Sequence, residues 1–384
     1  MPFDFDTLRR RPDFEAPNLV AVDATDRLLL DEAATSLAAA EPGEVVVIGD
    51  HYGALTLGAA ALHGSTGIRV HQDPLVGERA LDLNAAESNL SAVFTHHALD
   101  ESLVAGARVV LLQLPRSLSA LDEIAGLVAR HAHPEVAVFA GGRIKHMTLA
   151  MNDVLREHFQ VVYAGLARQK SRVVTASEPV VPPVESTWPR IERHTDVEVP
   201  GGALAVAAYG ATFAGARVDI GTRALLDVLP QAMPGAAVVA DLGCGSGVLA
   251  TVAALSRPTA RIIASDQSAA AVRSTAETVR LNGVAERVEV LREDAFASVS
   301  AGSCDLVLLN PPFHVDAAVE PGVARKLFEG AARVLRPGGE LWTVFNSHLG
   351  HRSVLEETVG ETRQISRNPK FTVTASVRRG SATP

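Results

Sequence analysis

The chain has 384 residues, of which 47% are hydrophobic and 21% are charged, and its formal net charge at pH 7 is −9. This length predicts two domains that can each bury a core, and the composition excludes an intrinsically disordered protein. The acidic balance argues against nucleic-acid binding through the overall field of the protein. The two cysteines, Cys244 and Cys304, form neither a disulfide framework nor a zinc pattern, so we expect no metal.

The N-terminal segment has no apolar run behind its basic residues, so we do not expect a signal peptide. No apolar stretch of the sequence is long enough to span a membrane. We therefore expect a cytoplasmic protein without membrane contact, and we favour a monomer.

The first half, residues 1–174, alternates apolar strand-like runs with Ala-rich helical stretches, which is the pattern of an α/β domain. Its last part carries an excess of basic residues: Arg143, Lys145, Arg156, Arg168, Lys170 and Arg172. A patch of this kind could contact RNA phosphates, although a solvated face explains the same residues equally well. Residues 175–200 are rich in proline and charge and lack periodicity, so we expect a linker there.

The second half, residues 201–384, contains a glycine-rich loop, ADLGCGSGVLA, between a predicted strand and a predicted helix. Three glycines permit a tight turn and a close approach of the backbone to a ligand: Gly243, Gly245 and Gly247. Asp241 comes just before them, where a carboxylate can bind an ammonium group. The glycine spacing is tighter than the G-x-G-x-x-G of NAD-binding proteins, so an NAD-dependent oxidoreductase is the least favoured interpretation.

Two acids follow the next two predicted strands. Asp266 ends the first of these strands and is well placed to accept hydrogen bonds from both hydroxyls of a ribose. Asp294 follows the second strand and could hold the edge of an adenine. An amine-facing acid, a glycine turn, a ribose acid and an adenine acid, in that order, together fit S-adenosylmethionine.

A fourth buried strand ends in the run LVLLNPPFH, where the prolines deny the sheet its backbone donors. An exocyclic amine is a poor nucleophile, and acceptors must hold its protons so that its lone pair faces the methyl group. The Asn310 side-chain oxygen and the Pro311 carbonyl can be those acceptors, and Pro311 and Pro312 fix their direction. Phe313 can stack on the base, whereas His314 is better explained as an orienting or structural residue than as a base.

The two halves resemble each other. The segment from Glu44 parallels the segment from Ala237, Asp73 parallels Asp266, and the run that ends at Arg116 parallels the run that ends at Phe313. In the first copy Gly49-Asp-His-Tyr-Gly stands for the glycine loop and Gln113-Leu-Pro-Arg stands for N-P-P-F. We therefore expect a duplicated domain whose first copy is catalytically silent and serves RNA recognition or shields the active domain.

From about Thr212 to Val377 the sequence resembles the class I S-adenosylmethionine-dependent methyltransferases. The segments that carry this resemblance are ATFAGARVDIGTRALL, DLGCGSGVLA, ASDQSAAAV, LNPPFH and RPGGELWTVFN. It is similar to the bacterial ribosomal RNA guanine-N2 methyltransferases, and its first half is more similar to the large-subunit type than to the small-subunit type.

This resemblance implies two tandem Rossmann-like α/β domains, the second with a seven-stranded, mostly parallel sheet that binds the cofactor at the ends of its first and fourth strands. It also implies that Asp219, Gly221 and Thr222 cover the methionine end of the cofactor, which Asn310 touches as well. The expected reaction is methyl transfer to the N2 amine of a guanine in ribosomal RNA. Two alternatives stay open: methylation of adenine N6 or protein glutamine, and a non-catalytic RNA-binding or ribosome-assembly protein.

Overall fold

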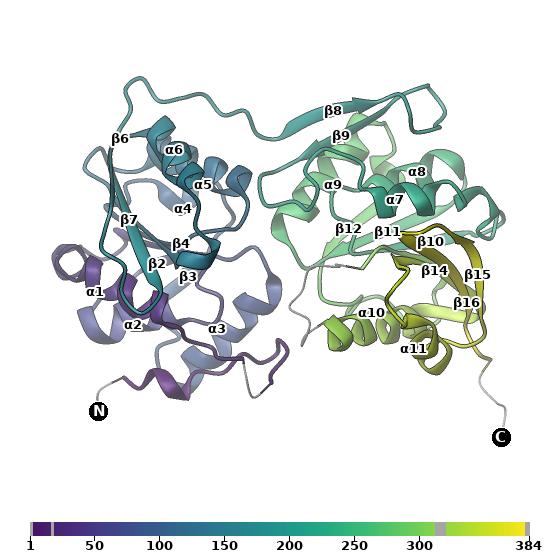
Figure 1. The fold of residues 1–384 in the computed structure, drawn as a ribbon, viewed down its shortest axis with the longest axis horizontal. Helices are drawn as coiled ribbons and strands as arrows, with labels where there is room; N and C mark the ends of the chain where they lie inside the picture. Colours follow the sequence, from purple (N-terminus) through teal and green to yellow (C-terminus); the bar gives the residue numbers. More distant parts are fainter. Residues whose placement is uncertain (1–2, 17–18, 312–319, 381–384) are drawn as a thin grey trace. The chain divides into compact units, whose positions relative to one another are not determined.

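The computed structural model describes residues 3–16, 19–311 and 320–380. The chain divides into two compact units, which are residues 1–188 and residues 189–384 (Figure 1). Each unit contains a seven-stranded sheet, and the order of the strands is the same in both sheets, β3-β2-β1-β4-β5-β7-β6 and β12-β11-β10-β13-β14-β16-β15. The predicted fold class, two tandem Rossmann-like α/β domains, is confirmed. No helix among the described residues is long and apolar enough to cross a membrane.

The elements of the first unit are η1 (Phe5–Thr7), α1 (Ala24–Ala39), β1 (Val45–Ile48), α2 (Ala54–His63), β2 (Ile68–His71), α3 (Leu75–Glu87), β3 (Phe94–His96), α4 (Glu101–Val104), β4 (Val109–Gln113), α5 (Leu118–His131), β5 (Ala137–Arg143), η2 (Ile144–His146), α6 (Leu149–His158), β6 (Phe159–Ala164) and β7 (Ser171–Pro179). Strands β1 to β5 pair in parallel, and β7 pairs antiparallel with both β5 and β6. Helices α1 to α3 supply one apolar cluster and α4 to α6 supply another.

The elements of the second unit are β8 (Arg190–His194), β9 (Leu204–Ala208), α7 (Ile220–Leu226), η3 (Leu229–Gln231), β10 (Val238–Leu242), α8 (Val248–Ser256), β11 (Arg261–Asp266), α9 (Ala269–Leu281), η4 (Ala285–Arg287), β12 (Val288–Arg292), β13 (Cys304–Leu309), α10 (Glu320–Val334), β14 (Leu335–Asn346), α11 (His351–Thr358), β15 (Thr362–Arg367) and β16 (Phe371–Val377). Strands β10 to β14 pair in parallel, and β16 pairs antiparallel with β14 and β15. Strands β8 and β9 form a separate hairpin.

The central strand β13 shows why an apolar run without polar alternation folds as a strand here. Leu306 and Leu308 pack into the cluster that contains α7 to α9, whereas Val307 and Leu309 pack into the cluster that contains α10 and α11. A parallel strand covered by helices on both faces needs apolar side chains on both faces. The core of this unit therefore holds the carboxyl end of β13, where Asn310 follows, in a fixed place.

The pairing of the strands fixes which residues of the two units correspond. Ile48 pairs with Leu112 in the first sheet, as Leu242 pairs with Leu309 in the second. Gly49 N–H donates to the His71 carbonyl, as Gly243 N–H donates to the Ser265 carbonyl. The counterpart of Ser265 is therefore His71.

Counting on from that pair, the residue that corresponds to Asp266 is Gln72, and the predicted match with Asp73 is wrong by one position. The next helices confirm this register, because their N-caps, Pro74 and Ser268, share the same backbone angles, φ −77° and ψ 126°. The first unit therefore has an amide where the second unit has a carboxylate.

The predicted linker, residues 175–200, differs from the structure at both ends. Residues 175–179 continue strand β7, which is held between β5 and β6 by hydrogen bonds on both sides. Residues 190–194 form β8, which pairs with β9 of the second unit. Sheet pairing thus overrides the proline-rich and charged composition that suggested an unpaired connection.

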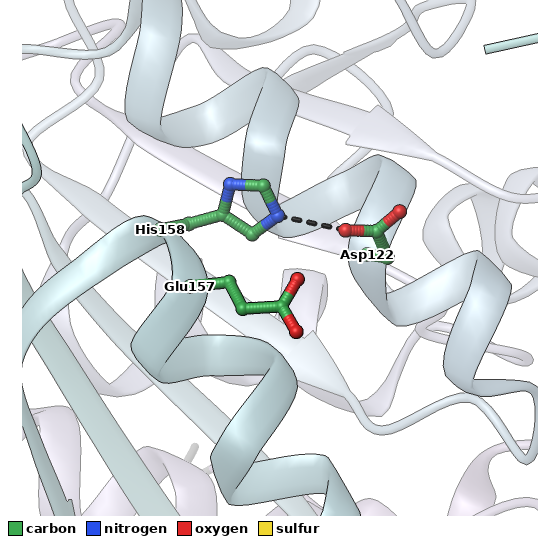
Figure 2. Close-up of side chains that lie close together, drawn as sticks. All are labelled: Asp122, Glu157 and His158. Atoms are coloured by element: carbon green, nitrogen blue, oxygen red, sulfur yellow. Dashed lines mark hydrogen bonds and ion pairs between the residues drawn. The ribbon is translucent and has the colours of Figure 1, made fainter. Parts of the chain in front are cut away.

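The end of the segment that follows β7 is tied to the first unit through Trp188. Its indole N–H donates to Asp122 Oδ2 at 3.1 Å, and His158 Nε2 lies 2.8 Å from Asp122 Oδ1 (Figure 2). His158 is 5% exposed, so this hydrogen bond lies in a buried setting. The carboxylate of Asp122 therefore joins α5, α6 and the segment before β8.

Asp122, Glu157 and His158 are also the one group of described side chains that could together hold a metal ion, with ligand atoms within 4.8 Å of one another. A metal at His158 Nε2 would displace the hydrogen bond to Asp122 and move the ring proton to Nδ1. That atom is buried and has no hydrogen-bond partner among the described residues. An unpartnered buried donor costs about 1–3 kcal/mol, so the arrangement is better suited to a structural hydrogen bond than to a metal.

Candidate active site

The carboxyl ends of β10 and β13 lie side by side, because Leu242 and Leu309 are paired in the parallel ladder. The glycine loop follows Leu242, and Asn310 follows Leu309. Parallel α/β sheets bind ligands at such an edge. The structure therefore brings the predicted cofactor loop and Asn310, the residue predicted to hold the amine, to the same edge of one sheet.

The three glycines of the loop have different surroundings. A Cβ atom on Gly243 or on Gly245 would meet no atom within 4 Å, so this side of the loop is open to a ligand. A Cβ atom on Gly247 would lie 2.9 Å from the Cα of Thr275, on α9. Gly247 also has φ 80° and precedes the first residue of α8. We infer that Gly247 allows the helices to pack, while Gly243 and Gly245 leave space for the ligand.

Asp241 lies in β10, just before the loop, and is 1% exposed. Its Oδ2 accepts a hydrogen bond from Ala250 N–H, in the first turn of α8, at 2.9 Å. Its Oδ1 is buried and has no hydrogen-bond partner within the described part of the chain. Burial raises the pKa of this carboxyl to about 7, against the lowering effect of the Ala250 hydrogen bond. A cationic group near Oδ1 would stabilise the charged form.

Asp266 ends β11 and holds the glycine loop. Its Oδ2 accepts a hydrogen bond from Gly245 N–H at 3.0 Å, and its Oδ1 accepts one from Ser268 N–H at 2.9 Å. A carboxylate oxygen has more than one lone pair, so these bonds are compatible with the predicted acceptance from ribose hydroxyls. Asp266 is therefore both a loop contact and a candidate ligand contact.

Asp294, the predicted adenine contact, follows β12 and forms an ion pair with Lys326 of α10. Its neighbour Glu293 is 6% exposed and accepts hydrogen bonds from the backbone and hydroxyl of Ser298. Lys326 was not predicted as a partner of Asp294, because it lies 32 positions further along the chain, on helix α10. Lys326 would have to share Asp294 with an adenine amine.

The carboxamide of Asn310 is held on one side only. Its Nδ2 donates to Thr222 Oγ1 at 3.0 Å and to Asp219 Oδ2 at 3.2 Å. Its Oδ1 is buried and has no hydrogen-bond partner among the residues that the structure describes. Pro311, which follows it, is buried. The other residues of the predicted motif, Pro312, Phe313 and His314, lie outside the described residues.

Asp219, Gly221 and Thr222 were predicted to cover the methionine end of the cofactor, and the structure gives them contacts with Asn310. Asp219 is the N-cap of α7 and accepts hydrogen bonds from the N–H groups of Gly221 and Thr222, at 2.8 and 3.3 Å. A Cβ atom on Gly221 would lie 3.2 Å from Asn310 Oδ1. The first turn of α7 thus packs directly against the candidate acceptor residue.

A sequence signal for this contact exists and sequence reasoning missed it. Residues 23–31 read DATDRLLLD, and residues 219–227 read DIGTRALLD. In both units the first Asp caps the helix, α1 or α7. In both units the side-chain amide at the carboxyl end of the fourth strand donates to the residue that lies three positions after this capping Asp. Gln113 donates to Asp26, and Asn310 donates to Thr222. The duplication therefore includes this helix.

The corresponding edge of the first unit lacks the predicted ligand contacts. Asp50, in the place of Cys244, accepts hydrogen bonds from Leu55 N–H and Thr56 N–H at 2.7 and 2.8 Å and so caps α2. Gln72, in the place of Asp266, is 1% exposed and donates to the Gly77 carbonyl at 3.0 Å.

The loop of the first unit is also covered by the N-terminal segment. The Tyr52 hydroxyl donates to Asp13 at 2.6 Å, and the Arg10 guanidinium lies 4.5 Å from the centre of the Tyr52 ring. The N-terminal segment thus contacts Tyr52 of the loop that corresponds to the open loop of the second unit.

The predicted basic segment is only partly paired with acids. Arg143 lies 3.9 Å from Asp23, Arg156 forms an ion pair with Asp153, and Arg168 lies 3.2 Å from Glu32. Two lysines of the segment are exposed: Lys145 and Lys170. Ile144 N–H donates to the Lys170 carbonyl, so η2, which carries Lys145, lies next to the turn that carries Lys170.

Two family models match the chain. A methyltransferase small domain matches residues 203–375, and an RLMG N-terminal domain matches residues 1–180. Among solved structures, the 16S rRNA N2 methyltransferase of T. thermophilus, in complex with AdoMet and guanosine, is similar with a TM-score of 0.73. This likeness covers 93% of this chain and 92% of the other, at 22% identity, and supports the two-domain fold.

Curated relatives show more than the fold. The ribosomal RNA large subunit methyltransferase G of Streptomyces avermitilis is 34% identical, over 98% of this chain and 98% of its own length. The protein of the same name from Pseudomonas aeruginosa PAO1 is 35% identical, over 97% of each chain. Identity at this level over nearly the whole length of both chains shows that the chain belongs to the ribosomal RNA large subunit methyltransferase G family.

Proposed function

We propose that the second unit transfers the methyl group of S-adenosylmethionine to the exocyclic N2 amine of a guanine in large-subunit ribosomal RNA. The observation that carries this proposal is the carboxamide of Asn310, whose nitrogen is held by the protein and whose buried oxygen has no partner in the described chain. It lies at the sheet edge that also carries the glycine loop. The choice of large-subunit ribosomal RNA as the substrate rests on the names of the relatives.

The residues at this edge fit S-adenosylmethionine. The open side of Gly243 and Gly245 leaves room for the ligand, Asp266 can accept from its ribose, and the buried Asp241 Oδ1 suits its ammonium group. Gly247 supports the loop, and Asp294 is the candidate for the adenine amine. When bound, S-adenosylmethionine supplies a methyl group made electrophilic by its positive sulfonium.

The chain's own task is to orient the acceptor amine. The buried Asn310 Oδ1 accepts one N–H of the amine, and the Pro311 carbonyl is the candidate for the other. With both protons held, the nitrogen lone pair points away from the acceptors and toward the methyl carbon. As methyl transfer proceeds, the nitrogen becomes positive and its protons bind more strongly to these oxygens, which lowers the barrier. The positive nitrogen then loses one of these protons to water, which leaves a neutral N-methyl amine. In this proposal Phe313 stacks on the base and His314 has an orienting or structural role.

The test is methylation in vitro. The full chain is incubated with methyl-labelled S-adenosylmethionine and either ribosomal RNA or ribosomal subunits from a strain that lacks the protein, and the RNA and the protein are digested separately and analysed by mass spectrometry. We expect label in N2-methylguanosine. Label in N6-methyladenosine or in protein glutamine would refute the proposal. Failure to transfer the methyl group to both naked RNA and ribosomal subunits would also refute it.

We propose further that the first unit has no methyltransferase activity and serves RNA recognition or shields the active domain. Gln72, the capping by Asp50 and the N-terminal segment over Tyr52 support the lack of activity of the first unit. Calorimetry on the full chain should give one S-adenosylmethionine per chain, and Asp266→Ala should weaken that one site. Two sites, or a site that Asp266→Ala leaves intact, would contradict a silent first unit.

A further inference from the structure

We propose that Thr222 and Asp219 are positioning residues, which fix the Asn310 carboxamide with its oxygen toward the group that receives the methyl. This orientation restricts the methyl acceptor to a group that donates N–H. This inference rests on the proposed function, because it assigns the polarity of that same acceptor site. It differs from the expectation that these residues cover the methionine end of the cofactor.

The polarity of the Asn310 amide follows from its neighbours. Asp219 Oδ2 lies 3.2 Å from Asn310 Nδ2, and an ionised carboxylate can only accept hydrogen bonds. A flipped amide would place its own oxygen against this carboxylate and lose that hydrogen bond, whereas the Thr222 hydroxyl, 3.0 Å from the amide nitrogen, can bond to either end of the amide and so fixes its place. The nitrogen therefore belongs on the side of α7, and the oxygen belongs on the other side.

The first turn of α7 is built to hold this geometry. Asp219 Oδ2 accepts from Gly221 N–H at 2.8 Å, so the oxygen that binds Asn310 is itself fixed by the helix backbone. A Cβ atom on Gly221 would lie 3.0 Å from Asp219 Oδ2 and 3.2 Å from Asn310 Oδ1. The glycine lets the turn approach the amide closely. Thr222 then follows on the same turn with its hydroxyl at the amide nitrogen.

The first unit shows which part of this arrangement is architectural. Gln113 donates to Asp26 at the corresponding positions, so a link between the first helix and the fourth strand persists without the other ligand contacts. In the second unit the same link leaves a buried oxygen without a partner in the described chain, which is costly unless a ligand completes it. The missing partner must be a hydrogen-bond donor, as the exocyclic amine of a base is.

The test compares Thr222→Val, which removes the hydroxyl but keeps the shape, with Thr222→Ser, which keeps the hydroxyl. We expect Thr222→Val to slow single-turnover methyl transfer at least tenfold while the dissociation constant of S-adenosylmethionine changes less than about threefold. Thr222→Ser should recover most of the rate. Asp219→Asn keeps an oxygen that can cap the helix and accept from Asn310 but removes the charge that strengthens this bond, so it should lower the rate to a smaller extent than Thr222→Val. Thr374→Val, at a buried threonine of β16, is the matched control and should keep the parental rate.

An NMR readout keeps the inference testable even if the parent protein does not methylate ribosomal RNA. In the free full-length protein, the side-chain N–H groups of Asn310 should exchange slowly with solvent, and Thr222→Val should accelerate that exchange. If Thr222→Val does not fold, Asp219→Asn gives the same measurement, because the weaker bond from Asn310 to an uncharged oxygen should accelerate the exchange in the same direction.

Two results would overturn the inference. The first is a Thr222→Val protein that transfers methyl at the parental rate or leaves the Asn310 exchange unchanged. The second is a Thr222→Val protein whose rate and cofactor affinity fall together, which would return Thr222 to the methionine end of the cofactor. If the parent protein does not methylate ribosomal RNA but Thr222→Val accelerates the Asn310 exchange, the proposed methyl acceptor is wrong and this inference stands.

Discussion

Asp266 accepts a hydrogen bond from the backbone N–H of Gly245 at 3.0 Å, so the acid that ends β11 holds the loop that follows β10. Its other oxygen accepts from Ser268 N–H, at the start of α9. One side chain thus connects the candidate ribose position with the glycine loop.

Replacing Asp266 should therefore cost more than its ribose contacts alone. Hydrogen bonds to a charged group contribute about 1.5–3 kcal/mol each, so Asp266→Ala should weaken S-adenosylmethionine binding at least tenfold. Isothermal titration calorimetry measures this change. Asp227→Ala, a replacement at another carboxylate of the same unit, serves as the control. An unchanged affinity in Asp266→Ala would mean that the ribose lies elsewhere.

The buried carboxyl of Asp241 predicts a pH dependence of cofactor binding. Burial raises its pKa to about 7 in the free protein, so the carboxyl is mostly protonated below that pH. A ligand ammonium binds the ionised form, and binding must then release a proton. Affinity should rise about tenfold between about pH 5.5 and 7, a range in which an α-amino group stays mostly charged.

Calorimetry in buffers of different ionisation enthalpy would detect the released proton. Asp241→Asn should bind weakly at every pH and should lose this dependence. Constant affinity for the parent protein across the range would show that Asp241 does not contact the ammonium group and serves only to cap α8.

Gly221→Ala should disturb catalysis more than stability. The added Cβ would lie 3.2 Å from Asn310 Oδ1 and 3.0 Å from Asp219 Oδ2, so the amide must shift by a few tenths of an ångström. Alanine is otherwise favoured over glycine in a helix by about 1 kcal/mol. We expect the methylation rate to fall about tenfold while the unfolding temperature changes by only a few degrees.

Gly235→Ala is the matched control, because a Cβ atom there would meet no atom within 4 Å. Equal rates for Gly221→Ala and Gly235→Ala would show that the contact between α7 and Asn310 does not matter for the reaction.

The basic segment of the first unit predicts a salt dependence of RNA binding. If the exposed Lys145 and Lys170 contact phosphates, replacing both by Gln should lower the slope of log affinity against log salt by roughly 0.7–0.9 per lost contact. Filter binding of ribosomal RNA over a range of salt concentrations measures this slope. Arg156, which is paired with Asp153, offers a control replacement with a smaller effect. Identical slopes would make the segment a solvated face.

Much of the fold was predictable because its signals are local. The apolar runs of β10 and β13 and the glycine loop between β10 and α8 mark a parallel sheet and its ligand edge. The duplication was visible for the same reason. Its register was not predictable, because the match of Asp73 with Asp266 looked natural by residue type. The hydrogen bond from Gly49 to His71 and the matching N-caps of the next helices show that Gln72 is the counterpart.

The candidate site was predictable residue by residue but not as a network. Asn310 follows Thr222 by 88 positions, and the hydrogen bond between them depends on how α7 packs on the sheet. The ion pair of Asp294 with Lys326 likewise joins residues 32 positions apart. Composition also misplaced the linker, because the charged and proline-rich end of β7 is stabilised by pairing with β5 and β6.

The most direct test of the account is single-turnover methyl transfer to ribosomal RNA by Asn310→Ala, with S-adenosylmethionine saturating. This change removes an acceptor whose contribution grows as the amine becomes positive, so it acts mainly on the transition state. The account predicts a rate lower by a factor on the order of a hundred or more, with a cofactor dissociation constant changed less than about tenfold, under about 1.4 kcal/mol. If Asn310→Ala methylates ribosomal RNA at the parental rate, the edge of β13 is not the acceptor site.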